Sequence, residues 1–339
     1  MRFSPVLRRA LVGSTALVLA TTLSGCWADD DDKADAQSGE TRVVVDDTTE
    51  EVTIPSSPER IIATGYAVPA LLEVDAPLVG ISEWSRGLNL MTDEDRASYE
   101  ELDKVAGESA ASTNYDAIAE LKPDLIIIGV PQPAVVDLNL DRLEQIAPVV
   151  QLGPSRPDKW KELNAKQADA AGVSATLEEN KAAYEAKAAE LTEKYADVLD
   201  GVSFGHVGGY GDVSAGNFQR EFAGSWGTNI ATDIGVTYYG EVKKAEGGSS
   251  DVSEYPAIEE LPASLGEADV ISYSVEDSGK PSAAVQYVLD SPLFQNLPAA
   301  KGGLTVPFKF TEAATYATAM TTLDEIDKAF AKAFAEDLA

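Results

Sequence analysis

The sequence predicts an α/β protein with two Rossmann-like lobes, each built on a mainly parallel sheet, connected by a rigid inter-lobe α-helix. In residues 60–152, short apolar runs typical of strands alternate with stretches of helical spacing. A second alternating series occupies residues 201–338, and residues 157–172 between the two series predict one helix. Such alternation favours parallel sheets covered by helices. The 339 residues, 44% of them hydrophobic, are enough for a core in each lobe.

The unit formed by residues 60–86 shows where a ligand would lie. Its apolar runs and its turn predict a strand at 60–64, a helix at 68–74 and a strand at 77–82. In an open α/β sheet the ligand crevice lies beyond the carboxyl ends of the strands. We therefore expect Tyr66, Trp84 and Arg86, which follow the two strands, to share one rim of a binding site.

The other elements of the first lobe follow from the same patterns. Alternating residues at 42–46 and 51–54 predict a lead-in hairpin. The remaining predicted elements are helices near 92–102, 116–122 and 137–146, and strands at 124–129 and 149–152.

The second half of the chain opens with a long Ala- and Glu-rich helix at 175–199, whose apolar stripe indicates core packing. The elements predicted after it are strands at 201–211, 269–274 and 304–307, helices near 226–234, 257–261, 282–289 and 318–338, and a turn at Tyr238 and Tyr239.

The first 26 residues are typical of an exported lipoprotein. Arginines precede an uncharged apolar run at 10–23, which is short for a membrane span, and Leu23-Ser24-Gly25-Cys26 resembles a bacterial lipobox. We expect residues 1–25 to be removed as a signal peptide and Cys26 to carry the acyl chains that anchor the protein outside the cell membrane. The alternative is a soluble secreted protein cut nearby. Residues 26–41 predict a disordered acidic tether.

The charge balance excludes nucleic-acid binding. The formal net charge is −31, from 26 Lys and Arg against 57 Asp and Glu. Three arginines lie in the predicted signal peptide, so the mature chain would carry 23 basic residues against 57 acidic ones, a net charge of −34. A surface this acidic repels nucleic acids and anionic lipid headgroups.

Four segments carry a family resemblance that runs in order from about Val43 to the C-terminus. They are SPERIIATGYAVPALLEVDAPLVGIS, NYDAIAELKPDLIIIG, LEQIAPVV and SPLFQNLPAAKGGLTV. Together they resemble the successive signatures of bacterial iron-siderophore and cobalamin substrate-binding lipoproteins of ABC importers, whose two lobes are joined by a long helix. The resemblance implies lobes at 42–156 and 173–339 joined by the helix at 157–172, in a monomer without a cofactor of its own.

The resemblance also implies a ferric siderophore as ligand and an ABC permease as partner. Aromatic faces and guanidinium groups suit the organic shell of such a chelate, which is often anionic. The second-lobe candidates for ligand binding are Tyr210, Arg220, Trp226, Tyr238 and Tyr239. By motif, Asp116 and Glu259 match the acidic residues with which the family docks on permease arginines, although a glutamate is usual at the first position and Glu254 or Glu260 could replace Glu259.

Other ligands and a catalytic function remain as alternatives. Cobalamin or haem is the runner-up ligand, and haem would want His206 or Tyr210 as an axial ligand. A bare transition metal is disfavoured because His206 is the only histidine. Gly201-Val202-Ser203-Phe204-Gly205 fits the G-x-S-x-G pattern of a serine hydrolase, but His206 is too close along the same strand for a catalytic triad.

Overall fold

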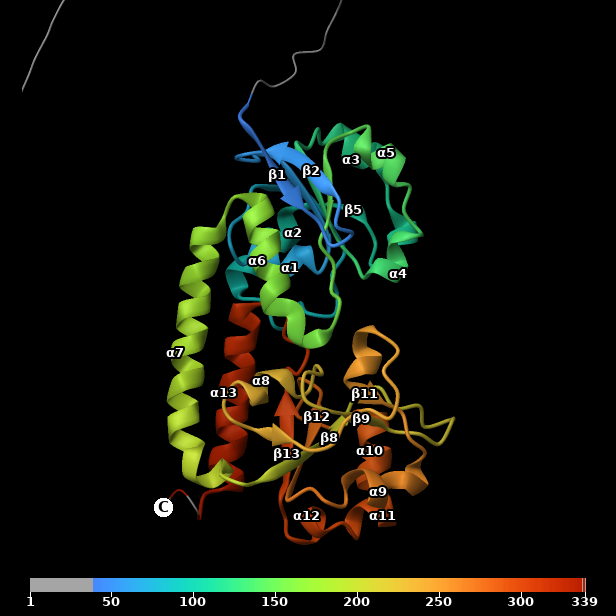
Figure 1. Cartoon of the computed structure of the whole chain (residues 1–339), viewed down its shortest axis with the longest axis vertical. Coiled ribbons are helices and arrows are strands. Elements are labelled where there is room, and N and C mark those ends of the chain that lie inside the picture. Colours follow the sequence, from blue (N-terminus) through green and yellow to red (C-terminus); the bar gives the residue numbers. More distant parts are fainter. Residues whose placement is uncertain (1–38, 337, 339) are drawn as a thin grey trace, which may run out of the picture. The chain divides into compact units, whose positions relative to one another are not determined.

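The computed structural model describes residues 39–336 and 338 of the chain (Figure 1). The predicted signal peptide, the predicted lipidation site Cys26 and most of the predicted tether lie outside these residues. Within residues 39–336, no helix combines the length and the apolar character that crossing a membrane requires.

The first lobe is built on a parallel sheet of five strands in the order β5-β4-β3-β6-β7. Its strands are β3 (Ile61–Gly65), β4 (Leu78–Ser82), β5 (Asp103–Ala106), β6 (Leu125–Gly129) and β7 (Val149–Gln151). Its helices are α1 (Ala67–Leu72), α2 (Asp93–Glu101), α3 (Tyr115–Glu120), α4 (Gln132–Val135) and α5 (Leu140–Glu144). The predicted strand–helix–strand unit is therefore confirmed, and β5 and α4 are additional to the prediction.

Helices cover both faces of this sheet because its central strands are apolar on both sides. Ile61 and Ile127 belong to the core that also contains α1, whereas Ile62, Ile126 and Ile128 pack with Ile118 of α3 and Leu143 of α5. Successive side chains of a strand point to opposite faces, so the run of buried residues in β6 requires cover on each side.

The predicted lead-in hairpin is also present. Strands β1 (Thr41–Val45) and β2 (Glu51–Pro55) pair antiparallel, and Asp46 accepts hydrogen bonds from the turn at Thr48 and Glu50. The backbone N–H of Asp47 donates to the carbonyl of Gln151, at 2.9 Å, which ties the hairpin to β7.

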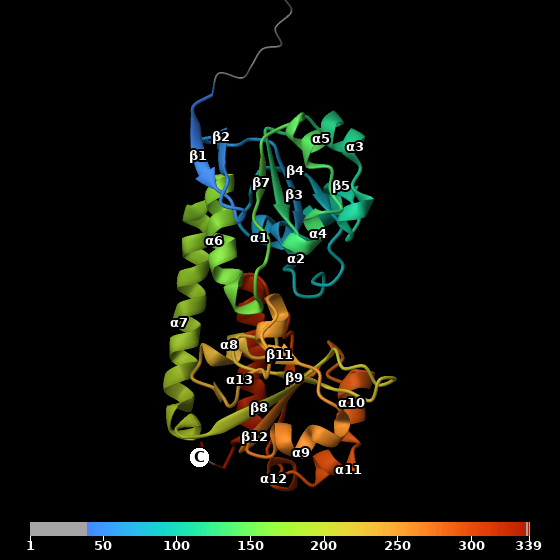
Figure 2. The same cartoon turned by 45° about the vertical axis from the view of Figure 1, so that its right-hand side comes forward.

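Two helices, rather than one, connect the sheets. Residues 157–172 contain a 3-10 turn and α6 (Trp160–Ala171), which ends at Gly172 in the left-handed conformation and packs on α1 of the first lobe. The chain continues directly into the 26-residue α7 (Ser174–Leu199), which lies beside the closing helix α13 (Tyr316–Ala333) in Figures 1 and 2. The predicted inter-lobe helix is thus only the first of a packed pair.

The sheet of the second lobe is mixed: β8, β10, β12 and β13 pair in parallel, as the sequence predicted, and the antiparallel pairs are those of β9. Its order is β11-β9-β8-β12-β13, with β10 also on β8, and β9 runs antiparallel to both β8 and β11. Its strands are β8 (Ser203–Gly208), β9 (Gln219–Glu221), β10 (Thr237–Tyr238), β11 (Ser253–Glu254), β12 (Val270–Val275) and β13 (Thr305–Lys309). The helices besides α13 are α8 (Asn229–Thr232), α9 (Leu261–Leu265), α10 (Ala283–Leu289), α11 (Pro292–Gln295) and α12 (Pro298–Lys301). The turn expected at Tyr238 is the short strand β10.

One hydrophobic core continues from the first sheet through α6 and α7 to the second sheet and α13. Three aromatic side chains, one from each of these helices, meet at its centre: Trp160, Tyr184 and Tyr316. Because interiors of this kind are close-packed, the linking helices hold the two sheets in a narrow range of arrangements.

Candidate functional site

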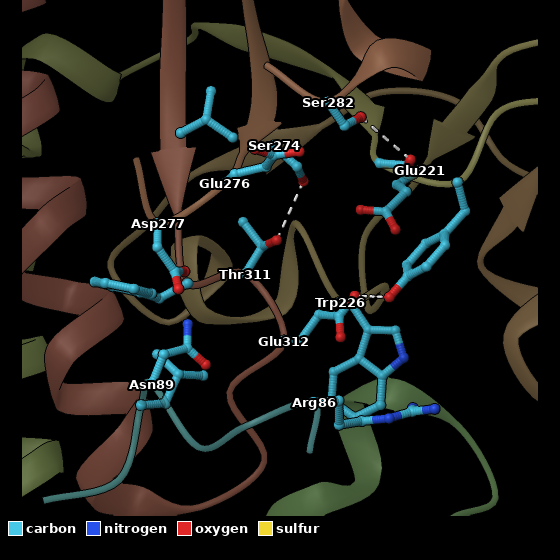
Figure 3. Close-up of a pocket in the computed structure, with 15 residues that line it drawn as sticks. Arg86, Asn89, Glu221, Trp226, Ser274, Glu276, Asp277, Ser282, Thr311 and Glu312 are labelled. Carbon is cyan, nitrogen blue, oxygen red and sulfur yellow. Dashed lines mark hydrogen bonds between the residues drawn. The ribbon is translucent and has the colours of Figure 1, made fainter. Parts of the chain in front are cut away.

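The candidate site lies at the carboxyl ends of the parallel strands, as the strand-end rule predicts. A cavity of about 270 Å³ is lined by residues that directly follow β4, β8, β12 and β13 (Figure 3). From the first lobe they include Arg86 and Asn89; from the second they include Tyr210, Glu221, Trp226, Ser274, Glu276, Asp277, Phe310, Thr311 and Glu312. The strands of both sheets therefore end at one cavity.

An aromatic cluster beside this cavity joins the two lobes. The ring of Tyr66 lies parallel to that of Trp226, with centroids 5.9 Å apart, and meets the ring of Trp84 edge-on at 4.8 Å. The guanidinium of Arg86 lies 5.6 Å from the Trp84 ring and donates to the Tyr66 hydroxyl at 3.2 Å. The structure thus brings together four of the predicted residues. Arg86 and Trp226 line the cavity, whereas Tyr66 and Trp84 do not, and Trp84 is only 7% exposed.

The position of Tyr66 depends on a close approach between the backbones of two glycines, Gly65 and Gly129. Gly65 has φ +56°, and a Cβ there would lie 2.6 Å from the carbonyl oxygen of Gly129. The same carbonyl accepts the backbone N–H of Tyr66 at 2.9 Å. The end of β3 therefore needs a residue without a side chain to direct Tyr66 towards the second lobe.

A buried polar pair forms the floor of the cavity in the second lobe. His206 on β8 and Glu221 on β9 lie 3.5 Å apart between a ring nitrogen and a carboxylate oxygen, and Glu221 accepts the backbone N–H of Gly227 at 2.8 Å. Both imidazole nitrogens contact serine hydroxyls, those of Ser272 and Ser274. Burial lowers the pKa of His206 to about 3 and raises the pKa of Glu221 to about 7, so the neutral forms of both are favoured at mildly acidic pH.

The segment after β13 completes the wall opposite Arg86. Glu312 accepts a hydrogen bond from the hydroxyl of Tyr210, and burial raises the pKa of Glu312 while the charge of Arg86 opposes that shift. Phe310 has φ +57°, a left-handed conformation that bulky residues rarely adopt, and its carbonyl accepts the hydroxyl of Thr322 at 2.7 Å. The strained backbone turns this segment into the cavity.

Three predicted second-lobe residues do not line the cavity. The guanidinium of Arg220 lies 4.3 Å from the ring of Phe222 and donates to the carbonyl of Tyr239, on the opposite face of β9 from Glu221. The hydroxyl of Tyr239 donates to the carbonyl of Ser264. Tyr238 is buried beneath the floor, with its hydroxyl 3.4 Å from that of Ser272. In the structure these three side chains are packing residues.

The prediction missed the acidic lining, namely Glu221, Glu276, Asp277 and Glu312. A signal for three of them was present, because Glu276 and Asp277 follow β12 and Glu312 follows β13. The strand-end rule that selected Tyr66 and Arg86 selects these positions as well.

The serine of the G-x-S-x-G pattern does not contact the histidine. Ser203 begins β8, at the end of the sheet away from the cavity, and its hydroxyl donates to the carboxylate of Asp269 at 2.8 Å. His206 is fully buried and bonded to serines of β12. This geometry rules out the serine-hydrolase alternative at Ser203.

Among the described residues, no cluster of three or more His, Cys, Asp or Glu side chains could hold a metal ion.

The two candidate docking residues lie on the surface of different lobes. Asp116 is in the first turn of α3, and its exposed carboxylate forms an ion pair with Arg142 of α5. Glu259 is exposed in a 3-10 turn before α9, next to Glu260, which pairs with Lys243 at 2.7 Å. A permease arginine would have to displace Arg142 from Asp116.

Residues 63–204, from β3 to the start of β8, match the model of a family described as periplasmic binding protein. Among curated proteins, none matches the sequence.

Solved structures resemble this chain over most of its length. The siderophore periplasmic binding protein from the fuscachelin gene cluster of Thermobifida fusca is 27% identical, with a TM-score of 0.63, and the alignment covers 82% of this chain and 98% of that one. The FhuD protein from S. pseudintermedius is 20% identical, with a TM-score of 0.64 and coverages of 85% and 97%. Staphylococcus aureus SirA, solved with staphyloferrin B, is 19% identical, with a TM-score of 0.65 and coverages of 86% and 98%.

The two staphylococcal proteins share the fold alone at this level of identity. With the family match, the comparisons confirm the predicted resemblance: the chain has the two-lobed fold of the iron-siderophore substrate-binding proteins of ABC importers. The matched family and the neighbour at 27% identity are binding proteins, not enzymes.

Proposed function

We propose that this protein captures a ferric siderophore outside the cell and delivers it to an ABC importer permease. The observation that carries the proposal is the cavity at the strand ends of both lobes, with Tyr66 from one lobe stacked on Trp226 from the other. Ligand sites of α/β proteins occur at strand ends, and aromatic faces suit the apolar parts of an organic chelate. The iron is cargo, already saturated by the siderophore, and needs no ligand from the protein.

The small volume of the cavity implies that the lobes must open before a siderophore can enter. Pockets for small molecules usually measure about 300–1,000 Å³, and this cavity measures about 270 Å³. A siderophore is large among such ligands, so its entry requires Tyr66 and Trp226 to separate. The continuous core along α6, α7 and α13 restricts that opening to a small movement of the lobes.

Anchoring and delivery complete the proposal. The lipobox-like sequence at Cys26 supports a lipid anchor, and the acidic residues Asp116 and Glu259, one on each lobe, support docking by ion pairs to permease arginines. We place the protein on the outer face of the cell membrane as a monomeric receptor.

The test is a fluorescence titration of the purified protein with ferric catecholate, hydroxamate and carboxylate siderophores, and with haemin and cobalamin as the alternative ligands. We expect at least one ferric siderophore to bind at micromolar concentration or below. Tight binding of haemin or cobalamin alone would replace the siderophore proposal. Haem has the weaker structural support, because His206 is fully buried and the hydroxyl of Tyr210 is committed to Glu312.

A further inference from the structure

We propose that the chelate accepted by this cavity is cationic, a ferric trihydroxamate whose free ammonium group lies against Glu276 and Asp277. This inference rests on the proposed function and names the chemical class of its substrate. The sequence had suggested that guanidinium groups would meet an often anionic chelate. The charges that the structure assembles around the cavity have the opposite sign.

Carboxylates outnumber cations in the lining. Glu221, Glu276, Asp277 and Glu312 face the cavity, and among the described lining residues Arg86 is the only cation. The predicted guanidinium of the second lobe, that of Arg220, points to the other face of the sheet. Because burial raises the pKa of Glu221 and of Glu312, the exposed Glu276 and Asp277 contribute most of the negative charge that an anionic chelate would meet in the second lobe.

The positive charge of Arg86 is already engaged. It donates to the Tyr66 hydroxyl at 3.2 Å and lies over the Tyr66 and Trp84 rings. Its charge also opposes the rise in the pKa of Glu312 and lowers the pKa of Glu108, although for Glu108 the hydrogen bonds from Ser85 matter more. An anion would have to compete with these neighbours for the guanidinium.

The carboxylates differ in what they already bind. Glu221 accepts hydrogen bonds from Gly227 and Gln219, and Glu312 accepts one from Tyr210. Within the described part of the chain, the carboxylates of Glu276 and Asp277 take part in no hydrogen bond or ion pair, and both residues are exposed at the end of β12. In Figure 3 this pair lies across the cavity from Trp226. These two groups are free to receive a cation from a ligand.

Ferric siderophores of different chemical classes carry different net charges, so the acidic lining favours some classes over others. Three hydroxamates neutralise Fe³⁺, and a free amine on the backbone makes the complex cationic near neutral pH. Three catecholates leave the complex a trianion, and carboxylate chelates are also usually anionic. The aromatic rings of Trp226 and Tyr210 suit the methylene linkers of a hydroxamate chain, while Glu276 and Asp277 suit its ammonium group.

The experiment compares chelates with one iron core and three end groups. A linear ferric trihydroxamate with a terminal amine is titrated beside its N-acetyl derivative, which is neutral, and its N-succinyl derivative, which is anionic; a ferric tris-catecholate is the fourth probe. The proteins are the wild type, a Glu276→Gln, Asp277→Asn double variant, and Glu241→Gln as a control at an exposed acidic residue outside the cavity lining. Thermal unfolding of each variant checks that it is folded.

We expect the amine form to bind about tenfold more tightly than the N-acetyl form, since two exposed carboxylates each contribute a few-fold at moderate salt, and the succinyl form to bind least tightly of the three. This preference should shrink to about twofold or less in the double variant and persist in Glu241→Gln. Tighter binding of the succinyl or catecholate probe by the wild type would overturn the inference and leave the proposed function intact. An amine preference that survives in the double variant would overturn the assignment to Glu276 and Asp277. Binding of none of the four would overturn the inference, and failure of the ferric carboxylate siderophores in the earlier titration would overturn the proposed function as well.

Discussion

The ring of Tyr66 in the first lobe lies within 9° of parallel to the ring of Trp226 in the second, with centroids 5.9 Å apart. An aromatic pair of this kind contributes about 0.5–1.5 kcal/mol. A ligand bound at micromolar affinity releases about 8 kcal/mol, so it can separate the pair and keep most of its binding free energy. The contact therefore holds the lobes together without closing the site permanently.

Trp226 should report ligand binding. We expect Trp226→Phe to abolish the change in tryptophan fluorescence on addition of the ferric chelate, because Trp226 is the tryptophan that lines the cavity. Trp160→Phe is the control, since Trp160 is 2% exposed in the core and its indole N–H donates to Asn229. A response lost with Trp160 and kept without Trp226 would place the ligand elsewhere.

Glu73 should stabilise the contact between α1 and α13. Its carboxylate accepts the backbone N–H of Ala317 in the first turn of α13 at 3.1 Å and the side-chain amide of Asn180 at 3.2 Å. We expect Glu73→Ala to lower the free energy of unfolding by about 1–3 kcal/mol, because it leaves buried donors without an acceptor at a helix N-terminus. Denaturant unfolding measures the change. The exposed Glu100→Ala is the control and should stay within about 0.5 kcal/mol of wild type.

His206 and Glu221 should have opposite effects on the pH dependence of stability. The pKa of His206 falls from 6.5 to about 3 on burial, so between these values the unfolded state binds the extra proton and stability is lost as pH falls. The pKa of Glu221 rises from 4.5 to about 7, so the folded state binds the extra proton and stability is lost as pH rises through this range. In the wild type the two slopes largely cancel between pH 4.5 and 6.5.

Replacing His206 or Glu221 alone should reveal how the other residue changes stability with pH. Relative to wild type, His206→Asn should lose stability as pH rises from 4.5 to 6.5, and Glu221→Gln should lose it as pH falls over the same range, each by up to a few kcal/mol. Comparison with wild type at each pH cancels the contributions of the other carboxylates. If the difference in free energy of unfolding between variant and wild type did not change with pH for either variant, the interpretation of His206 and Glu221 as a buried neutral pair would be wrong.

Reversal of the docking charges should stop import without changing affinity for the chelate. Asp116→Lys and Glu259→Lys together place positive charges where the permease would present arginines, and each single reversal should weaken uptake only in part. Uptake in cells that lack the native receptor measures the effect. Glu120→Lys and Glu267→Lys are matched controls at exposed glutamates near each site. Wild-type transport by the double reversal would mean that the permease docks elsewhere.

Loss of the lipidated cysteine should release the protein from the membrane. We expect Cys26→Ala to give a folded protein that binds its chelate with unchanged affinity but partitions into the aqueous phase of a detergent extraction, because acyl chains supply the anchor. Retention in the detergent phase would refute the lipobox interpretation.

The sequence by itself determined most elements of the first lobe, without β5 and α4, and one rim of the site. Short apolar runs, a glycine turn and helical spacing are local properties, so β3, α1 and β4 could be predicted with Tyr66, Trp84 and Arg86 at the strand ends. The strand-end rule needs only the strand and its direction, and for the same reason it could have found Glu276 and Glu312. The family resemblance likewise follows from local motifs.

Only the tertiary structure decided which second-lobe residues reach the cavity. Arg220 and Glu221 are neighbours on β9, and the antiparallel register that pairs Glu221 with His206 turns Glu221 to the cavity and Arg220 to the opposite face. A shift of one residue would exchange them and reverse the sign of the charge at the site. The pairing of Tyr66 with Trp226 depends in turn on how α6, α7 and α13 pack between the lobes. Register and packing join residues far apart in the chain, so no local pattern encodes them.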